Sequence, residues 1–252
     1  MNRKMALMVA VCAVGGLACS AGAEGLEVNG EISTTIASSY FWRGKEVNDA
    51  EVFQPQVMLG IGKWTVSALG TWDMRGEPAS STRTRVDVQA DYSYEWDKVQ
   101  LKAGAVARIY HDDPGNKARD TYEVYVQAAA PDMPFYPSIT IYYDFGMIDG
   151  LYASLAAGQT WEIRGGMDIV LDARVGVATE GFNQRFFGDE SLRGGLVDVS
   201  GSLCLRIAYR EFFITPKVEY VTLVDSALRD AAEAAGRSPD GVIGGISVAW
   251  SF

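Results

Sequence analysis

The feature that most constrains this chain is a sustained alternation of apolar and polar residues. It runs from Val28 to Trp42, with apolar, small or aromatic residues at even positions and mostly polar residues at odd positions. A period of two is typical of a β-strand with one apolar and one polar face. The run is longer than most soluble strands, and it matches a tilted strand that crosses a bilayer and protrudes on one side.

The same alternation recurs along the rest of the chain. It predicts twelve strands, at residues 28–42, 53–61, 64–72, 86–96, 99–109, 122–128, 139–145, 151–161, 167–177, 197–207, 212–220 and 242–252. An even number is expected for a closed barrel whose two ends lie in the periplasm. We therefore predict an all-β fold, a closed antiparallel transmembrane β-barrel of about 12 strands.

The connections between these strands support a membrane barrel. Short connections such as 62–63 and 97–98 alternate with longer ones such as 43–51 and 75–81, and 146–150 is the one exception. Membrane barrels have short periplasmic turns and longer outer loops, so the order of lengths fits them. A secreted β-sandwich or open barrel is the alternative fold, but a soluble sandwich has no reason to keep this order.

The tryptophans give a second, independent indication. All six belong to the apolar set and lie near strand ends: Trp42, Trp64, Trp72, Trp96, Trp161 and Trp250. There an indole can place its N–H among headgroups and its ring in lipid. We predict that these six residues form the membrane girdles, with outer-membrane lipid as their surroundings.

The two ends of the chain carry export and assembly features. Residues 1–23 have a short basic start, an apolar stretch and an A-x-A site, which predicts a cleaved signal peptide and a barrel of residues 24–252. Lipidation at Cys19 is the weaker alternative, because Leu17 lies one place too close to it. The final strand, with Gly245, Trp250 and Phe252, resembles the signal read by the outer-membrane barrel assembly machinery, a predicted partner.

The charge of the chain excludes one class of partner. Cleavage after residue 23 removes two basic residues and no acid, which changes the formal net charge from −10 to −12. No basic stripe exists to displace counterions from phosphates, so nucleic acid is not an expected partner.

The polar face of the predicted strands carries too many charges for a dry core. The wider inward set includes Glu31, Glu123, Asp144, Asp198 and Glu219. The candidates for lining a lumen are Arg83, Arg85, Asp87, Asp91, Lys102, Arg108, Asp172, Arg174, Arg206 and Lys217.

The turn at 97–98 makes one part of this face predictable. A two-residue hairpin there sets Asp87 opposite Arg108 and Asp91 diagonal to Lys102. Two alternatives remain open: such residues mainly satisfy one another, or some of them line a path for small solutes.

Enzymatic chemistry finds little support in the sequence. The single histidine, His111, lies in a turn-like outer segment rather than on a strand beside a serine, and Cys204 is expected to be an inert inward-facing thiol. No cluster or loop suggests a metal, a phosphate or any other cofactor, so none is predicted.

Residues 38–74 resemble the opening of the TorF family of small outer-membrane porins. That family has an S-x-Y-x-x-R-G motif, a Q-P-x-x-x-x-G strand and a strand ending in W-x-x-x-x-D. Here the corresponding residues are Ser39 to Gly44 (with Ser and Tyr adjacent, a departure), Gln54-Pro55 and Trp72-Asp73. The resemblance covers about a fifth of the mature chain, and it implies an outer-membrane location and a pore role without catalytic residues.

These observations leave two main hypotheses for function. The first is a narrow porin-like channel for small polar solutes, which are then the predicted cargo. The second is a non-conducting barrel that presents its outer loops 179–194 and 225–241 for adhesion or membrane integrity. In those loops, residues 226–236 have helix-forming composition, and three phenylalanines at 182–190 could fold inward or bind a partner. A lipid-modifying enzyme is the least supported alternative.

Overall fold

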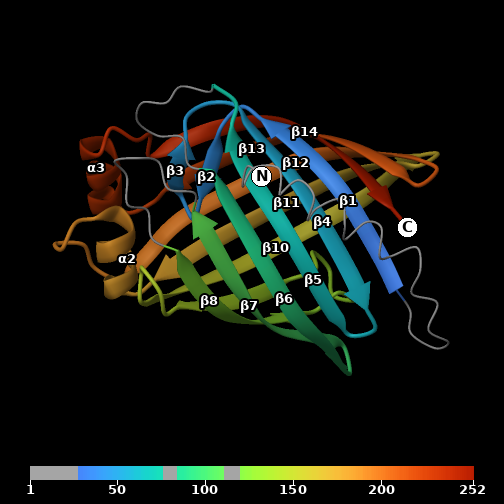
Figure 1. Ribbon diagram of the computed structural model, residues 1–252, viewed down its shortest axis with the longest axis horizontal. Helices are drawn as coiled ribbons and strands as arrows, with labels where there is room; N and C mark the ends of the chain where they lie inside the picture. The colour runs from blue at the N-terminus through green and yellow to red at the C-terminus, as the bar shows by residue number, and fades with distance from the viewer. Residues whose placement is uncertain (1–27, 76–83, 111–119) are drawn as a thin grey trace, which may run out of the picture.

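The computed structural model describes residues 28–75, 84–110 and 120–252. Twelve strands of these residues form one closed antiparallel barrel, in which β1 pairs with both β4 and β14. They are β1 (Val28–Ala37), β4 (Val52–Ile61), β5 (Trp64–Asp73), β6 (Arg85–Trp96), β7 (Val99–Tyr110), β8 (Thr121–Ala129), β9 (Ser138–Asp144), β10 (Gly150–Arg164), β11 (Met167–Ala178), β12 (Gly195–Tyr209), β13 (Phe212–Leu223) and β14 (Asp240–Ser251). The predicted fold class is confirmed (Figure 1).

The barrel has its apolar residues outside and its charges inside. Val126, Leu155 and Leu203 are each more than half exposed, at 55%, 59% and 55%. Glu123 and Asp198, by contrast, are fully buried, at 0%. A soluble protein arranges these residue types in the opposite way, so the exterior is suited to lipid rather than to water.

The short turns lie at one end of the barrel, together with the start of β1 and the end of β14. The 62–63 and 97–98 turns join paired residues Ile61 and Trp64, and Trp96 and Val99. At the same end the Gly30 and Phe252 backbones exchange two hydrogen bonds, with N···O distances of 2.8 and 2.9 Å, which close the seam.

Five of the six tryptophans follow the predicted outward orientation. Trp64, Trp96, Trp161 and Trp250 lie at the short-turn end and are 38–66% exposed. Trp72 lies at the opposite end beside the exposed Phe53, with ring centroids 6.1 Å apart.

The prediction for Trp42 is wrong. The first barrel strand ends at Ala37, and the chain then leaves the wall as β2 (Tyr40–Trp42) and β3 (Lys45–Asn48), which form a separate two-stranded sheet. Trp42 packs inside against Phe186, with a centroid distance of 5.0 Å. Tyr40 and Trp42 keep the even parity of the apolar residues before them, although Phe41 between them is aromatic too, so parity does not reveal that the chain has turned inward.

A second departure concerns Val197, which parity places on the lipid side. Between β11 and β12 the register shifts, because Gly176 pairs with Asp198 whereas Val177 pairs with Leu196. Val197 is the extra residue of this β-bulge, and it is fully buried in the apolar cluster at the barrel end. An inserted residue reverses the parity of what precedes it, and this explains the error.

Two short helices cover the long-loop end of the barrel, beside β2 and β3 (Figure 1). They are α2 (Glu180–Phe187) and α3 (Ser226–Ala234), and α3 confirms the helix predicted within 226–236. Neither of them, nor any other helix in the described ranges, has the length and apolar character needed to cross a membrane.

The three phenylalanines of the 182–190 segment fold inward. Phe182, Phe186 and Phe187 are buried in one apolar cluster, whose other buried members are Ile148, Tyr152, Leu192, Val197, Leu223, Leu228 and Ala232. The backbone of α2 approaches Gly150 so closely that a Cβ there would lie 2.6 Å from the Phe182 nitrogen. We call this group the mouth cluster.

The seam yields a first prediction. A Cβ on Gly30 would overlap the ring of Phe252, so a side chain at residue 30 must displace the terminal aromatic. Gly30→Val should lower the free energy of unfolding by about 1–3 kcal/mol, as overpacking does. The loss can be measured by urea unfolding in lipid vesicles, with the folded fraction determined from heat-modifiable gel mobility.

Gly244→Val is the matched control, because a Cβ at Gly244 meets no atom within 4 Å. Equal stability of the two variants would show that the Phe252 ring does not secure the seam.

Candidate functional site

The β2–β3 hairpin crosses the interior of the barrel. Arg43 and Gly44 form its tip, with φ angles of 51° and 78°, the pattern of a type I′ turn. On one side, Arg43 reaches Glu123 of β8. On the other, a Cβ on Gly44 would lie 2.6 Å from Leu223 Cδ2 and 2.7 Å from Asp198 Cβ. Three strands separate β8 from β12, so the tip spans the lumen.

The Arg43 guanidinium lies at the centre of this constriction. It donates to both carboxylate oxygens of Glu123, at 2.7 and 2.9 Å, and is only 4% exposed. Its Cζ lies 4.5–5.4 Å from four ring centroids, those of Trp42, Tyr142, Tyr152 and Phe182. An unpaired guanidinium would be costly here, so the bidentate pair and the aromatic faces are what allow Arg43 to be buried.

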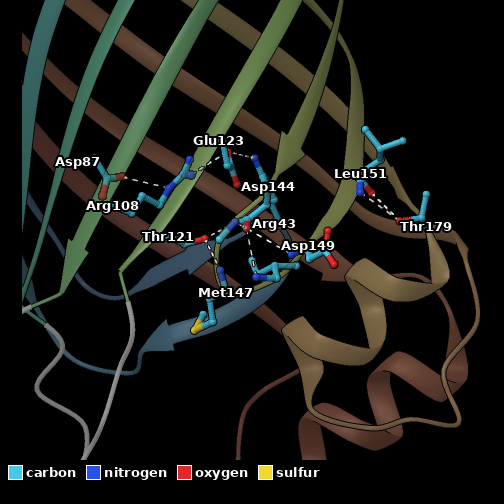
Figure 2. Close-up of polar contacts among 12 residues, drawn as sticks. Arg43, Asp87, Arg108, Thr121, Glu123, Asp144, Met147, Asp149, Leu151 and Thr179 are labelled. Carbon is cyan, nitrogen blue, oxygen red and sulfur yellow. Dashed lines mark hydrogen bonds and ion pairs between the residues drawn. The ribbon is translucent and has the colours of Figure 1, made fainter.

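Glu123 connects the hairpin to a longer row of ion pairs. It also forms an ion pair with Arg108, whose Nη1 lies 2.7 Å from Glu123 Oε2, and Arg108 Nε lies 3.6 Å from Asp87. Asp87 in turn pairs with Arg85, at 2.8 Å. Figure 2 shows Asp87, Arg108 and Glu123 joined in sequence on the barrel wall.

The register confirms both predicted contacts around the 97–98 turn. Asp87 pairs directly with Arg108, and Lys102 lies 3.5 Å from Asp91. A two-residue turn at 97–98 is therefore enough to fix these contacts.

Asp144 shapes the loop that leads into the mouth cluster. Its carboxylate accepts from Thr121 Oγ1 at 2.6 Å and from the Gly146 and Ile148 nitrogens at 2.9 and 3.1 Å. Asp144 is fully buried and lies directly across from Glu123 (Figure 2). Its carboxylate therefore adds a second negative charge beside Glu123 and the arginines that pair with Glu123.

The same loop holds α2 in place. Asp149 pairs with Arg185 of α2 at 2.6 Å, and hydrogen bonding from Arg185 lowers the pKa of the Asp149 carboxyl. Lys45 of the hairpin donates to the Phe186 carbonyl at 2.5 Å, and the Glu46 carboxylate accepts from the Ser238 nitrogen at 2.9 Å. The hairpin and both long loops are thus tied into one unit.

Two polar cavities lie in the lumen beside the constriction. The larger, about 360 Å³, is lined mainly by β9–β13 and includes Asp172, Arg174, Ser202, Lys217 and Glu219. The smaller, about 230 Å³, lies against the hairpin residues Tyr40 and Phe41 and the wall of β1, β4, β13 and β14. Lys217 and Glu219 line both, so the cavities adjoin.

The predicted lumen residues divide into groups. Arg85, Asp87, Asp91, Lys102 and Arg108 lie in ion pairs on the β6–β7 wall. Asp172, Arg174 and Lys217 line the larger cavity. Arg206 pairs with Asp168, and Arg83 lies outside the described residues.

Arg43 is an interior residue that was not predicted from the sequence. It belongs to the predicted outer connection 43–51, although an Arg-Gly pair between two short alternating runs is a usable turn signal. The wider inward set did contain Glu123, its partner. Across the described ranges, no group of three or more His, Cys, Asp or Glu side chains could hold a metal ion, and His111 lies outside those ranges.

Comparison with known proteins shows which solved structures have a similar fold. No family model and no curated protein matches the chain. The solved KdgM porin matches 88% of this chain and 99% of its own, with a TM-score of 0.55 and 11% identity. The NanC porin matches 88% and 98%, with a TM-score of 0.51 and 13% identity.

An outer membrane channel from Pseudomonas putida F1 matches 89% of this chain and 95% of its own, with a TM-score of 0.50 and 9% identity. These likenesses establish the fold, which is that of the small outer-membrane porins.

A second prediction concerns the pair at the hairpin tip. Glu123→Gln leaves the guanidiniums of Arg43 and Arg108 without their shared carboxylate, and breaking such a pair costs about 3–5 kcal/mol while both groups stay buried. Release of the hairpin relieves that cost. Trypsin, which cleaves after arginine, should therefore cut at Arg43 in the variant and not in the parent, as read by mass spectrometry.

Glu190→Gln, which removes an exposed loop carboxylate, is the control and should leave Arg43 protected. If folded Glu123→Gln barrels resist trypsin at Arg43 as the parent does, the pair does not hold the hairpin.

Proposed function

We propose that this protein is an outer-membrane channel for small polar solutes, narrowed by its β2–β3 hairpin. The observation that carries the proposal is the polar cavity of about 360 Å³ inside a barrel with an apolar exterior and a porin fold. Charges of both signs on its wall suit polar rather than apolar solutes. The hairpin tip reduces an already narrow twelve-stranded lumen, so only small molecules should pass.

The charged residues take two roles in this proposal. Asp172, Arg174 and Lys217, with Arg206 nearer the short-turn end, line the path. Arg85, Asp87, Asp91, Lys102 and Arg108 instead hold the wall and the hairpin together. This division follows the ion pairs and the cavity lining.

The same proposal includes the export of the protein, its assembly and its position in the membrane. The barrel of residues 24–252 is exported with removal of residues 1–23 and inserted through its Trp250–Phe252 end by the assembly machinery. Trp64, Trp72, Trp96, Trp161 and Trp250 serve as girdles in outer-membrane lipid. The TorF-like segment fits such a pore, and the KdgM porin has been solved in complex with disordered oligogalacturonate, which supports a polar cargo for this fold.

A second candidate is a non-conducting barrel that presents its outer loops. The observation that favours it is the mouth cluster, in which Phe182, Leu192 and Leu228 are 0–2% exposed. Packed apolar side chains at the barrel end oppose the passage of water and ions. A lipid-modifying enzyme stays the weakest candidate, because nothing in the cavity pairs a nucleophile with a histidine in the described residues.

A third prediction separates the two candidates. Purified protein in planar bilayers should give small, discrete conductance steps. Replacing residues 40–48 with a short Gly-Ser linker should raise the step size severalfold, because the hairpin tip then leaves the lumen. Single-channel recording measures both values, with heat-unfolded protein as the control.

If the parent and the linker variant both fold and both remain silent across salt concentrations, the channel is contradicted and the loop-presenting barrel takes its place.

A further inference from the structure

We propose that the larger lumen cavity selects small cations over anions, and that the Asp172 carboxylate gives it this preference. The inference rests on the proposed channel function and names the class of solute that the channel prefers: metal cations and small molecules that carry an ammonium group.

The cavity wall carries two cationic residues, and both are paired. Lys217 Nζ lies 2.7 Å from Glu219 Oε2, and Arg174 lies 3.4 Å from Asp198. A carboxylate this close cancels most of the field of its cation at the distance of a passing ion. Neither cation should therefore attract anions effectively.

Asp172 is different. It is exposed to the cavity, and no Lys, Arg or His within the described ranges lies within 4 Å of its carboxylate. Its direct partners on the neighbouring strands are Gly158 of β10 and Ser202 of β12, which bear no charge. The charges of the lining residues themselves balance, but Lys217 is paired with Glu219 and Arg174 has Asp198, outside the lining, as its partner. Asp172 is therefore the one charged residue among the described lining residues that has no close ion partner.

The position of Gly158 directs that charge into open space. A Cβ at Gly158 would overlap Asp172 Oδ1, so the carboxylate occupies the volume that a side chain on β10 would otherwise fill. Gly158 also lines the cavity. The absence of a side chain there lets Asp172 stay hydrated and accessible.

The constriction beside the cavity does not reverse this preference. Arg43, Arg85 and Arg108 lie with three carboxylates, those of Asp87, Glu123 and Asp144. The charges in this group balance, and all but Asp87 are buried. The unpaired Asp172 carboxylate of the cavity wall is therefore the charge that an ion meets in accessible space.

The expected size of the effect follows from elementary electrostatics. A unit charge about 4 Å from an ion in a water-like medium changes the local ion occupancy about fivefold. At about 0.1 M salt the screening length is roughly 10 Å, comparable with the width of such a lumen, so the effect survives. It should fall as salt rises toward 1 M.

The test is the reversal potential in a KCl gradient, with K⁺ and Cl⁻ as the probes. The parent should show a K⁺ to Cl⁻ permeability ratio of about five or more, and Asp172→Asn should reduce it severalfold, toward one. Asp230→Asn on the exposed face of α3 removes the same charge outside the lumen and should leave the ratio unchanged.

A second set of variants tests the charge itself. In a Cys204→Ser background, Asp172→Cys modified with a sulfonate-bearing methanethiosulfonate should regain cation preference, whereas modification with the trimethylammonium reagent should give anion preference.

A conducting parent that prefers Cl⁻, or a ratio unchanged by Asp172→Asn, overturns this inference and leaves the channel standing. A folded barrel that never conducts overturns the proposed channel and the inference together.

Discussion

The interior of this barrel is organised by one buried ion pair, Arg43 with Glu123. Arg43 is at the tip of a hairpin that, among the described strands, has no backbone pairing with the barrel wall, so its side chain is the principal polar anchor of that tip. Burying a guanidinium at 4% exposure is unfavourable unless a carboxylate meets it in good geometry. Glu123 supplies this geometry, and the rings around Arg43 exclude water from it.

The pair divides the lumen into two environments. At the long-loop end, the mouth cluster and the row of ion pairs from Arg85 to Glu123 are packed and largely buried. Beside them, the wall of β9–β13 keeps a polar cavity of about 360 Å³. A separate two-stranded sheet tied by side chains can move as a unit more easily than a strand of the wall, because no ladder of backbone bonds must break. Passage of solutes would then depend on the hairpin rather than on the barrel.

Much of this fold could be predicted from sequence, since period-two alternation fixes which face of each strand is apolar. The same rule located the outward tryptophans and, through the 97–98 turn, the contacts of Asp87 and Asp91. It failed at Trp42 and Val197 for a shared reason. Parity describes a strand but not whether that strand stays in the wall or gains a residue at a bulge. The Arg43–Glu123 pair joins residues 80 positions apart, so it leaves no local pattern to find.

The most direct test is a double-mutant cycle on this pair, with Arg43→Gln and Glu123→Gln singly and together. The free energy of unfolding is measured by urea titration of barrels folded in lipid vesicles. We expect a coupling free energy of about 2 kcal/mol or more, because both groups are buried and bidentately bonded. A coupling below about 0.5 kcal/mol, the value for independent sites, would contradict this expectation.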